Sequence, residues 1–177
     1  MARILETATF APSAHNRQPW RFVVLTASEA KARLAEAMGA AFRHDLEKDG
    51  FSEGEINLRL ARSRRRLQEA PVAIVLCLDT TAGDAYPDAS RQRAEYLMGV
   101  QSVAMAGNTL LLAAHAEGLG GVWVCAPLFS PNETQRALDL PESWQPQGMI
   151  LMGYPAEIPQ PRPRRPRSEI VVYADFS

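Results

Sequence analysis

The sequence has few cysteines and almost no net charge, and each of these features argues against certain classes of protein. Its two cysteines, Cys77 and Cys125, lie in apolar runs without the close partners that a zinc site needs, so we expect two buried thiols. The formal net charge of -1 argues against nucleic acid or an anionic membrane as a partner. No apolar run approaches the roughly 20 residues that span a bilayer, and residues 1–10 lack the apolar run of a signal peptide. We therefore expect a cytoplasmic protein.

Length and composition are those of one globular unit. The 177 residues are 46% hydrophobic and 22% charged, which allows a sizeable core. We expect a single domain over 1–177 whose last part, 159–177, is an extended C-terminal arm. The arm begins with the proline-rich stretch "PQPRPRRPR" and leads into "SEIVVY", which reads as a last strand or an arm.

Three helices are predicted from apolar spacing and end signals. The first covers about 29–48 with Ser28 as its cap, and the second runs from a capping box at Ser52 and Glu55 to Glu69. The third and longest covers about 91–117 and is apolar all round, which predicts a central, buried helix. Ser130 and Glu133 predict a further capping box, with proline at the first helical position.

Strands are predicted at 21–25, 72–78, 122–126 and 149–155. The run 72–78 is apolar without alternation, which indicates a strand covered on both faces. Helices and strands alternate irregularly, so the fold class is α+β, with helices on both sides of a central sheet. Small residues such as Gly99 and Gly107 on the long helix fit either tight internal packing or a subunit interface, and we expect a homodimer.

The stretch "APSAHNRQPWRFVVL" near the start is a rigid polar loop followed by a strand. It resembles the flavin-contacting loop of the FMN-dependent nitroreductase family. "NTLLLAAHAEGLGGVWV", "MGYPAE" and "RPRRPRSEIVVY" resemble three later segments of that family in the same order. Within the family, "AYPD", "EGLGGVW" and "LDLPESWQPQGMILMGYPAE" look closest to the nitroreductase-like domain of deazaflavin-coenzyme biosynthesis enzymes. The resemblance implies a mixed or antiparallel sheet, bound FMN and a homodimer.

The resemblance also implies a set of cofactor-binding residues. From the opening loop, one subunit would reach the flavin held by the other. Arg66, with Ser63 beside it, would face the pyrimidine ring, and Arg162 and Arg164 would hold the phosphate. The main chain of 124–129 would face flavin N5, with the N–H of Leu128 as donor. The complete set is Pro12, Ser13, Ala14, Asn16, Ser63, Arg66, Cys125, Ala126, Leu128, Arg162 and Arg164.

The roles of several other loop residues follow from their chemistry. Asn16 and Gln18 are expected to hydrogen-bond the loop backbone, and Trp20 to anchor the loop by packing. His15 is a candidate proton donor that we do not call catalytic. For the arginines of 62–66, a solvated basic face is the alternative to a flavin contact.

The implied activity is hydride transfer from NADH or NADPH to FMN and on to an unidentified small-molecule acceptor, in a ping-pong cycle. Two alternatives stay open: a flavin- or deazaflavin-binding module without redox activity, and an FMN-dependent reductase of a biosynthetic intermediate. The sequence departs from the family in one respect, because the arginine- and serine-containing phosphate segment expected upstream of Pro12 is not present. We expect either that the segment is lost or that the chain is truncated, with weaker FMN binding.

Overall fold

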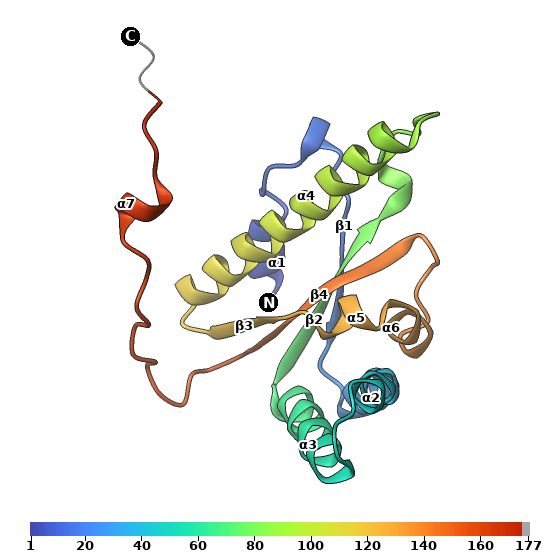
Figure 1. Cartoon of the computed structure of the whole chain (residues 1–177). Coiled ribbons are helices and arrows are strands. Elements are labelled where there is room, and N and C mark those ends of the chain that lie inside the picture. Colours follow the sequence, from blue (N-terminus) through green and yellow to red (C-terminus); the bar gives the residue numbers. More distant parts are fainter. Residues whose placement is uncertain (175–177) are drawn as a thin grey trace.

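A four-stranded antiparallel sheet organises the molecule, in the order β1-β2-β4-β3 (Figure 1). The computed structural model describes residues 1–174. The strands are β1 (Trp20–Leu25), β2 (Val72–Asp79), β3 (Gly120–Val124) and β4 (Trp144–Gly153). The longer helices are α1 (Ala2–Ala8), α2 (Ser28–Lys48), α3 (Glu53–Glu69), α4 (Ala89–Ala116) and α6 (Pro131–Ala137). The predicted α+β class is confirmed.

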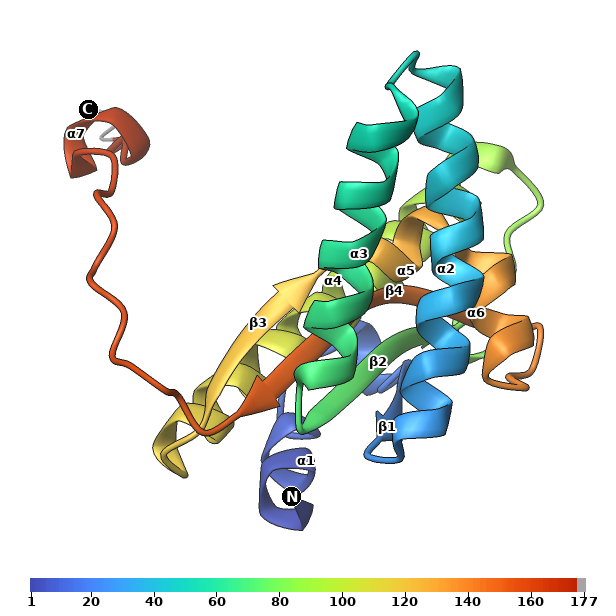
Figure 2. The ribbon, with the colours of Figure 1, turned by 90° about the horizontal axis from the view of Figure 1, so that it is seen from below.

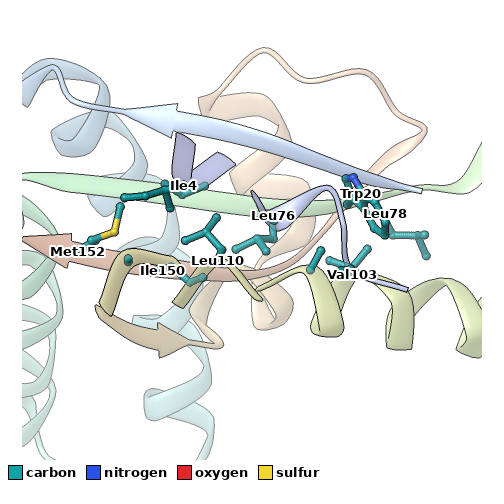
Figure 3. Close-up of a cluster of buried hydrophobic side chains, with 13 residues drawn as sticks. Ile4, Trp20, Leu76, Leu78, Val103, Leu110, Ile150 and Met152 are labelled. Atoms are coloured by element: carbon teal, nitrogen blue, oxygen red, sulfur yellow. The ribbon is translucent and has the colours of Figure 1, made fainter. Parts of the chain in front are cut away.

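The central strand β2 is covered on both faces, as its unbroken apolar run predicts. Ile74, Leu76 and Leu78 join the core that the sheet forms with α1 and α4 (Figure 3). Their neighbours Val75 and Cys77 join a second core, which the sheet forms with α2, α3 and α6. Because side chains alternate along a strand, one apolar run serves both cores. Burying each large side chain contributes about 1.5–3 kcal/mol.

The helix caps follow the sequence only in part. The capping box at Ser52 and Glu55 is confirmed at the start of α3. The expected cap at Ser28 is wrong, because Ala27 precedes α2 and Ser28 is its first helical residue. The capping box expected at Ser130 is also wrong, since the Ser130 hydroxyl donates back to Ala126 O at 3.1 Å in the preceding turn, α5 (Ala126–Phe129).

Helix α4 is central but not buried all round. Its buried face packs on the sheet, where Gly99 meets Leu78 and Gly107 meets Trp123, so these glycines serve internal packing. Its other face exposes four large side chains: Tyr96, Leu97, Met105 and Leu112. A helix on one side of a sheet has protein on one side only, which is why the expectation of complete burial is wrong.

Helix α4 also corrects the expectation that no segment is long and apolar enough to cross a membrane. An 18-residue window of α4 has a mean hydropathy of 1.4, which meets that test by length and composition alone. However, Val103, Ala106 and Leu110 of α4 are fully buried against the sheet. That packing is typical of a core helix.

Several element bounds differ from the sequence prediction. Strand β3 ends at Val124, and β4 begins at Trp144, opposite Asp79 of β2. Two short 3-10 turns, η1 (Ala14–Asn16) and η2 (Thr80–Ala82), were not predicted. After Gly153 the chain leaves the body as an extended arm that carries one helical turn, α7 (Arg167–Ile170) (Figures 1 and 2). "SEIVVY" therefore lies in an arm, because a strand needs a neighbouring strand to pair with.

Candidate functional site

A cavity of about 730 Å³ lies where the α2–α3 pair meets the ends of β3 and β4. Its apolar wall includes Met38 and Phe42 of α2, Leu67 of α3, and Met149 of β4. Figure 2 shows α2 and α3 side by side on the sheet face opposite α4. Three residues predicted for the site line this cavity together: Ser63, Arg66 and Ala126.

One face of α3 supplies cationic groups to the cavity, whose lining also includes Asp45 and Asp49. Arg59, Arg62 and Arg66 all line it, because residues three or four apart lie on the same side of a helix. Arg59 stacks on Phe51 at 4.4 Å from the ring centroid. Within residues 1–174, Arg62 and Arg66 form no ion pair, whereas their neighbour Arg65 pairs with Glu69 at 3.0 Å. Unpaired guanidinium groups beside an apolar wall suit a flat ligand with acceptor atoms or negative charge.

The segment after β3 meets the cavity at Ala126, Phe129 and Ser130, and of these only Ala126 was predicted for the site. Cys125 is exposed, and its sulfur accepts a hydrogen bond from Trp123 Nε1 at 3.2 Å. The Leu128 N–H, which the sequence predicts to face flavin N5, donates to Cys125 O at 2.9 Å within the turn. The Leu128 side chain lines a separate surface hollow with Gln135 and Gln147. A contact from Leu128 to a flavin therefore stays a prediction and requires the turn to adjust.

The two cysteines differ sharply in accessibility, and the expectation that both are buried is wrong for Cys125. Burial raises the pKa of Cys77 to about 12, so its thiol does not ionise at neutral pH. We expect a thiol reagent such as Ellman's reagent to titrate one cysteine in the native protein and both in denaturant. Cys125→Ser should abolish the native reaction. A native reaction that persists in this variant would contradict the burial of Cys77.

The opening loop is held by hydrogen bonds of its own. Ser13 Oγ accepts from Gln18 N at 3.1 Å, and Asn16 Oδ1 accepts from Gln18 Nε2 at 3.3 Å. The amide pair thus bonds side chain to side chain, and not to the loop backbone as expected. Trp20 is 5% exposed and anchors the loop in the core, as predicted. His15, Asn16 and Gln18 have positive φ angles of 50–53°, which the surrounding contacts must stabilise.

The remaining predicted site residues lie outside the cavity. Ala14 N donates to Ser102 Oγ of α4 at 3.3 Å, which places the loop on the α4 side of the sheet. Pro12, Ser13 and Asn16 belong to the same loop and do not line the cavity. On the arm, Arg164 donates to the carbonyls of Arg162 and Pro163, and neither arginine lines the cavity. One chain therefore brings together only part of the predicted site.

The sequence analysis missed two aromatic residues of the cavity, Phe42 and Phe129. Phe42 continues the apolar spacing of α2, yet it is 38% exposed at the cavity. Phe129 is 77% exposed. Phe42 is an apolar side chain near the polar end of an amphipathic helix, and this position could have indicated a binding residue. No local pattern marks Phe129.

Comparison with known proteins identifies the family of the chain. The family model described as the nitroreductase family matches residues 1–154. A protein of Methanothermobacter thermautotrophicus, provisionally named an NADH dehydrogenase/NAD(P)H nitroreductase, is 31% identical over 166 residues, 90% of this chain and 68% of its own. The 5,6-dimethylbenzimidazole synthase of Rhodospirillum rubrum is 30% identical over 165 residues, 89% of this chain and 72% of its own.

The fold also occurs in the solved structure of an FMN oxidoreductase. The NADPH:FMN oxidoreductase of Vibrio harveyi, complexed with NAD+, superposes with a TM-score of 0.70 at 21% identity. The match covers 99% of this chain and 67% of that one. The similarity of fold therefore extends over the sheet and both helical layers. The chain belongs to the nitroreductase family.

Proposed function

We propose that this protein is an FMN-dependent oxidoreductase that works as a homodimer with flavin sites at the subunit interface. The observation that carries the proposal is the cavity in which Ser63, Arg66 and Ala126 meet beside an apolar wall. Its volume of about 730 Å³ lies within the usual range for cofactor sites. Family membership and the FMN named for a structural neighbour support the same cofactor. Two free cysteines fit a cytoplasmic location.

The residues of the cavity fit the parts of FMN. The apolar wall at Met38, Phe42 and Met149 suits the isoalloxazine ring, which needs contact without polar competition. Arg66 and Ser63 supply donors for the acceptor atoms of the pyrimidine edge. An arginine there would also stabilise negative charge at that edge. The same walls exclude water from the ring.

A second copy of the chain would complete the site. The face of α4 opposite the sheet exposes Leu97, Met105 and Leu112, which form an apolar surface suited to a subunit contact. The opening loop and the arm carry the predicted residues that do not reach the cavity of their own chain. In the proposed dimer, Pro12, Ser13, Ala14 and Asn16 contact the partner's flavin. The exposed arm brings Arg162 and Arg164 to a phosphate.

FMN, when bound, supplies the redox chemistry by accepting a hydride from NADH or NADPH and passing electrons to an acceptor. The protein binds and orients the ring and excludes water. The N–H of Leu128 is the predicted main-chain donor toward the ring, if the turn that now engages it opens. No side-chain acid, base or nucleophile is required.

An absorption spectrum tests the proposal directly. Purified protein incubated with FMN and desalted should stay yellow, and NADH or NADPH should bleach it under anaerobic conditions. Protein that binds FMN and stays oxidised with every donor would instead be a flavin-binding module. Protein that never retains FMN contradicts both.

A second candidate function rests on the 30% identity to a 5,6-dimethylbenzimidazole synthase. With this second function, the flavin site would catalyse one step of a biosynthetic pathway and would not reduce a broad range of electron acceptors. Chromatography of the FMN-loaded protein with NADPH and oxygen distinguishes the two. Formation of 5,6-dimethylbenzimidazole supports the synthase, and NADPH consumption without that product supports the oxidoreductase.

Arg164→Ala should weaken FMN binding by about tenfold, because a charge-assisted contact to the phosphate is lost. Fluorescence titration with FMN measures the change. Riboflavin, which lacks the phosphate, should bind the variant and the unchanged protein equally. Equal FMN affinity in the two proteins would remove Arg164 from the site.

A further inference from the structure

A second, smaller cavity of about 70 Å³ lies beneath the opening loop. The loop contributes Ala14 and Arg17, the end of β2 contributes Asp79, and the first half of α4 contributes Glu95 and Ser102. Figure 1 shows the start of α4 beside the end of β2. No residue of this cavity lines the proposed flavin cavity. It is separate from that cavity, and of its lining residues the proposed function uses only Ala14, in the loop that would contact the partner's flavin.

Glu95 is the unusual residue of this cavity. It is only 7% exposed, and its Oε1 accepts one hydrogen bond, from Asp84 N at 3.2 Å. Its Oε2 is buried and has no hydrogen-bond partner within residues 1–174. Gly83 packs so closely that an added Cβ would lie 3.1 Å from Oε1. A buried carboxylate with a single backbone donor is costly, so a further donor is needed at Oε2.

The other acidic groups of the cavity already have cationic partners. Asp79 pairs with Arg21 at 2.7 Å, and Asp84 pairs with Arg17 at 2.6 Å. Glu95 belongs to none of the ion pairs found within residues 1–174. Within the described residues, the cavity therefore contains one carboxyl group that has no cationic partner. A ligand that brings both positive charge and N–H donors would satisfy it.

We propose that this cavity binds the cationic end group of a small molecule, an ammonium or guanidinium group, through Glu95. The cavity volume equals that of about two water molecules. It therefore admits a group of a few heavy atoms, and the rest of a larger ligand would stay outside. A metal ion is a poorer match, because no cluster of three acidic, histidine or cysteine ligands exists in the described part of the chain. Planar guanidinium also matches carboxylate oxygens with two parallel donors.

Because the cavity lies beneath the opening loop, a ligand bound in it would affect the stability of that loop. A bound cation would connect the opening loop, the turn before α4 and α4 itself through Arg17, Asp84 and Glu95. Occupancy should therefore stabilise the loop. Any effect on the partner's flavin rests on the proposed function, whereas binding of the cation does not.

Calorimetry and thermal unfolding test the proposal, with guanidinium and methylammonium chloride as probes at low millimolar concentration. Sodium chloride at equal ionic strength is the baseline, and tetramethylammonium, which has no N–H donor, is the matched control. We expect saturable binding of the two probes and a Tm rise of about 4 °C at ten times Kd. Tetramethylammonium should have no effect.

Glu95→Gln should abolish the binding, and Glu36→Gln, which removes an exposed charge elsewhere, should preserve it. FMN binding in the absence of the probes should be unchanged in Glu95→Gln, which separates this proposal from the flavin site. If Glu95→Gln does not fold, the comparison of guanidinium with tetramethylammonium in the unchanged protein decides alone. Absence of saturable binding, or equal binding of all three cations, would overturn the proposal and leave the cavity to water.

Discussion

Gly148→Ala is expected to lower the free energy of unfolding by about 3 kcal/mol, at the upper end of the range for overpacked cores. An added Cβ at Gly148 would lie 2.6 Å from Cε2 of Trp123. The ring has no room to retreat, because a Cβ at Gly107 on the other side would lie 3.1 Å from its Cε3. Trp123 also donates to Cys125, so its displacement disturbs the end of β3 beside the proposed flavin cavity. Urea denaturation measures the loss.

Gly54→Ala is the matched control for this prediction. Gly54 lies in the first turn of α3, and a Cβ there would meet nothing within 4 Å. Alanine at a helical position should leave stability unchanged or raise it by up to about 1 kcal/mol. If Gly148→Ala and Gly54→Ala have equal stability, Trp123 is not confined between β4 and α4.

Arg66→Met should reduce FMN affinity by about tenfold to a hundredfold, the effect of losing a charge-assisted hydrogen bond in a partly dry site. Methionine keeps much of the apolar length of arginine and removes the charge. Arg66 is exposed in the single chain, so the fold itself should not change. Fluorescence titration gives the affinity, and circular dichroism checks the fold.

Arg64→Met provides the control on the same helix. Arg64 is exposed and does not line the cavity, so its loss should leave FMN affinity unchanged. Unlike Arg164→Ala, Arg66→Met should weaken riboflavin binding as much as FMN binding, because Arg66 is assigned to the ring. An equal effect of the two variants at 64 and 66 would mean that only general positive charge matters.

Local sequence patterns predicted the core well because burial and periodicity are linked. The unbroken apolar run at 72–78 correctly predicted a strand between two layers, and the capping box at Ser52 marked the start of α3. The same logic failed for α4, since apolar composition cannot distinguish a face buried in the core from one left exposed. Ser28 was assigned as a cap from residue type alone, although the cap position depends on backbone dihedrals.

The candidate site was predictable only where its residues share one element or adjoining ends. Ser63 and Arg66 lie three residues apart on α3. Ala126 was assigned to the same site only through the resemblance to the family, and it lines the same cavity. In one chain, neither the loop with Pro12 and Asn16 nor the arm with Arg164 lines that cavity. Their roles depend on a second chain, which neither local spacing nor the fold of one copy can supply. Those assignments stay predictions.

Sedimentation velocity, followed at the visible absorbance of the flavin, tests the central claim of an interfacial site most directly. We predict that the flavin of FMN-loaded protein sediments with the dimer, at one flavin per chain. Dilution to the monomer should release FMN. Flavin that sediments with the monomer at full occupancy would contradict a site completed by the partner's loop and arm.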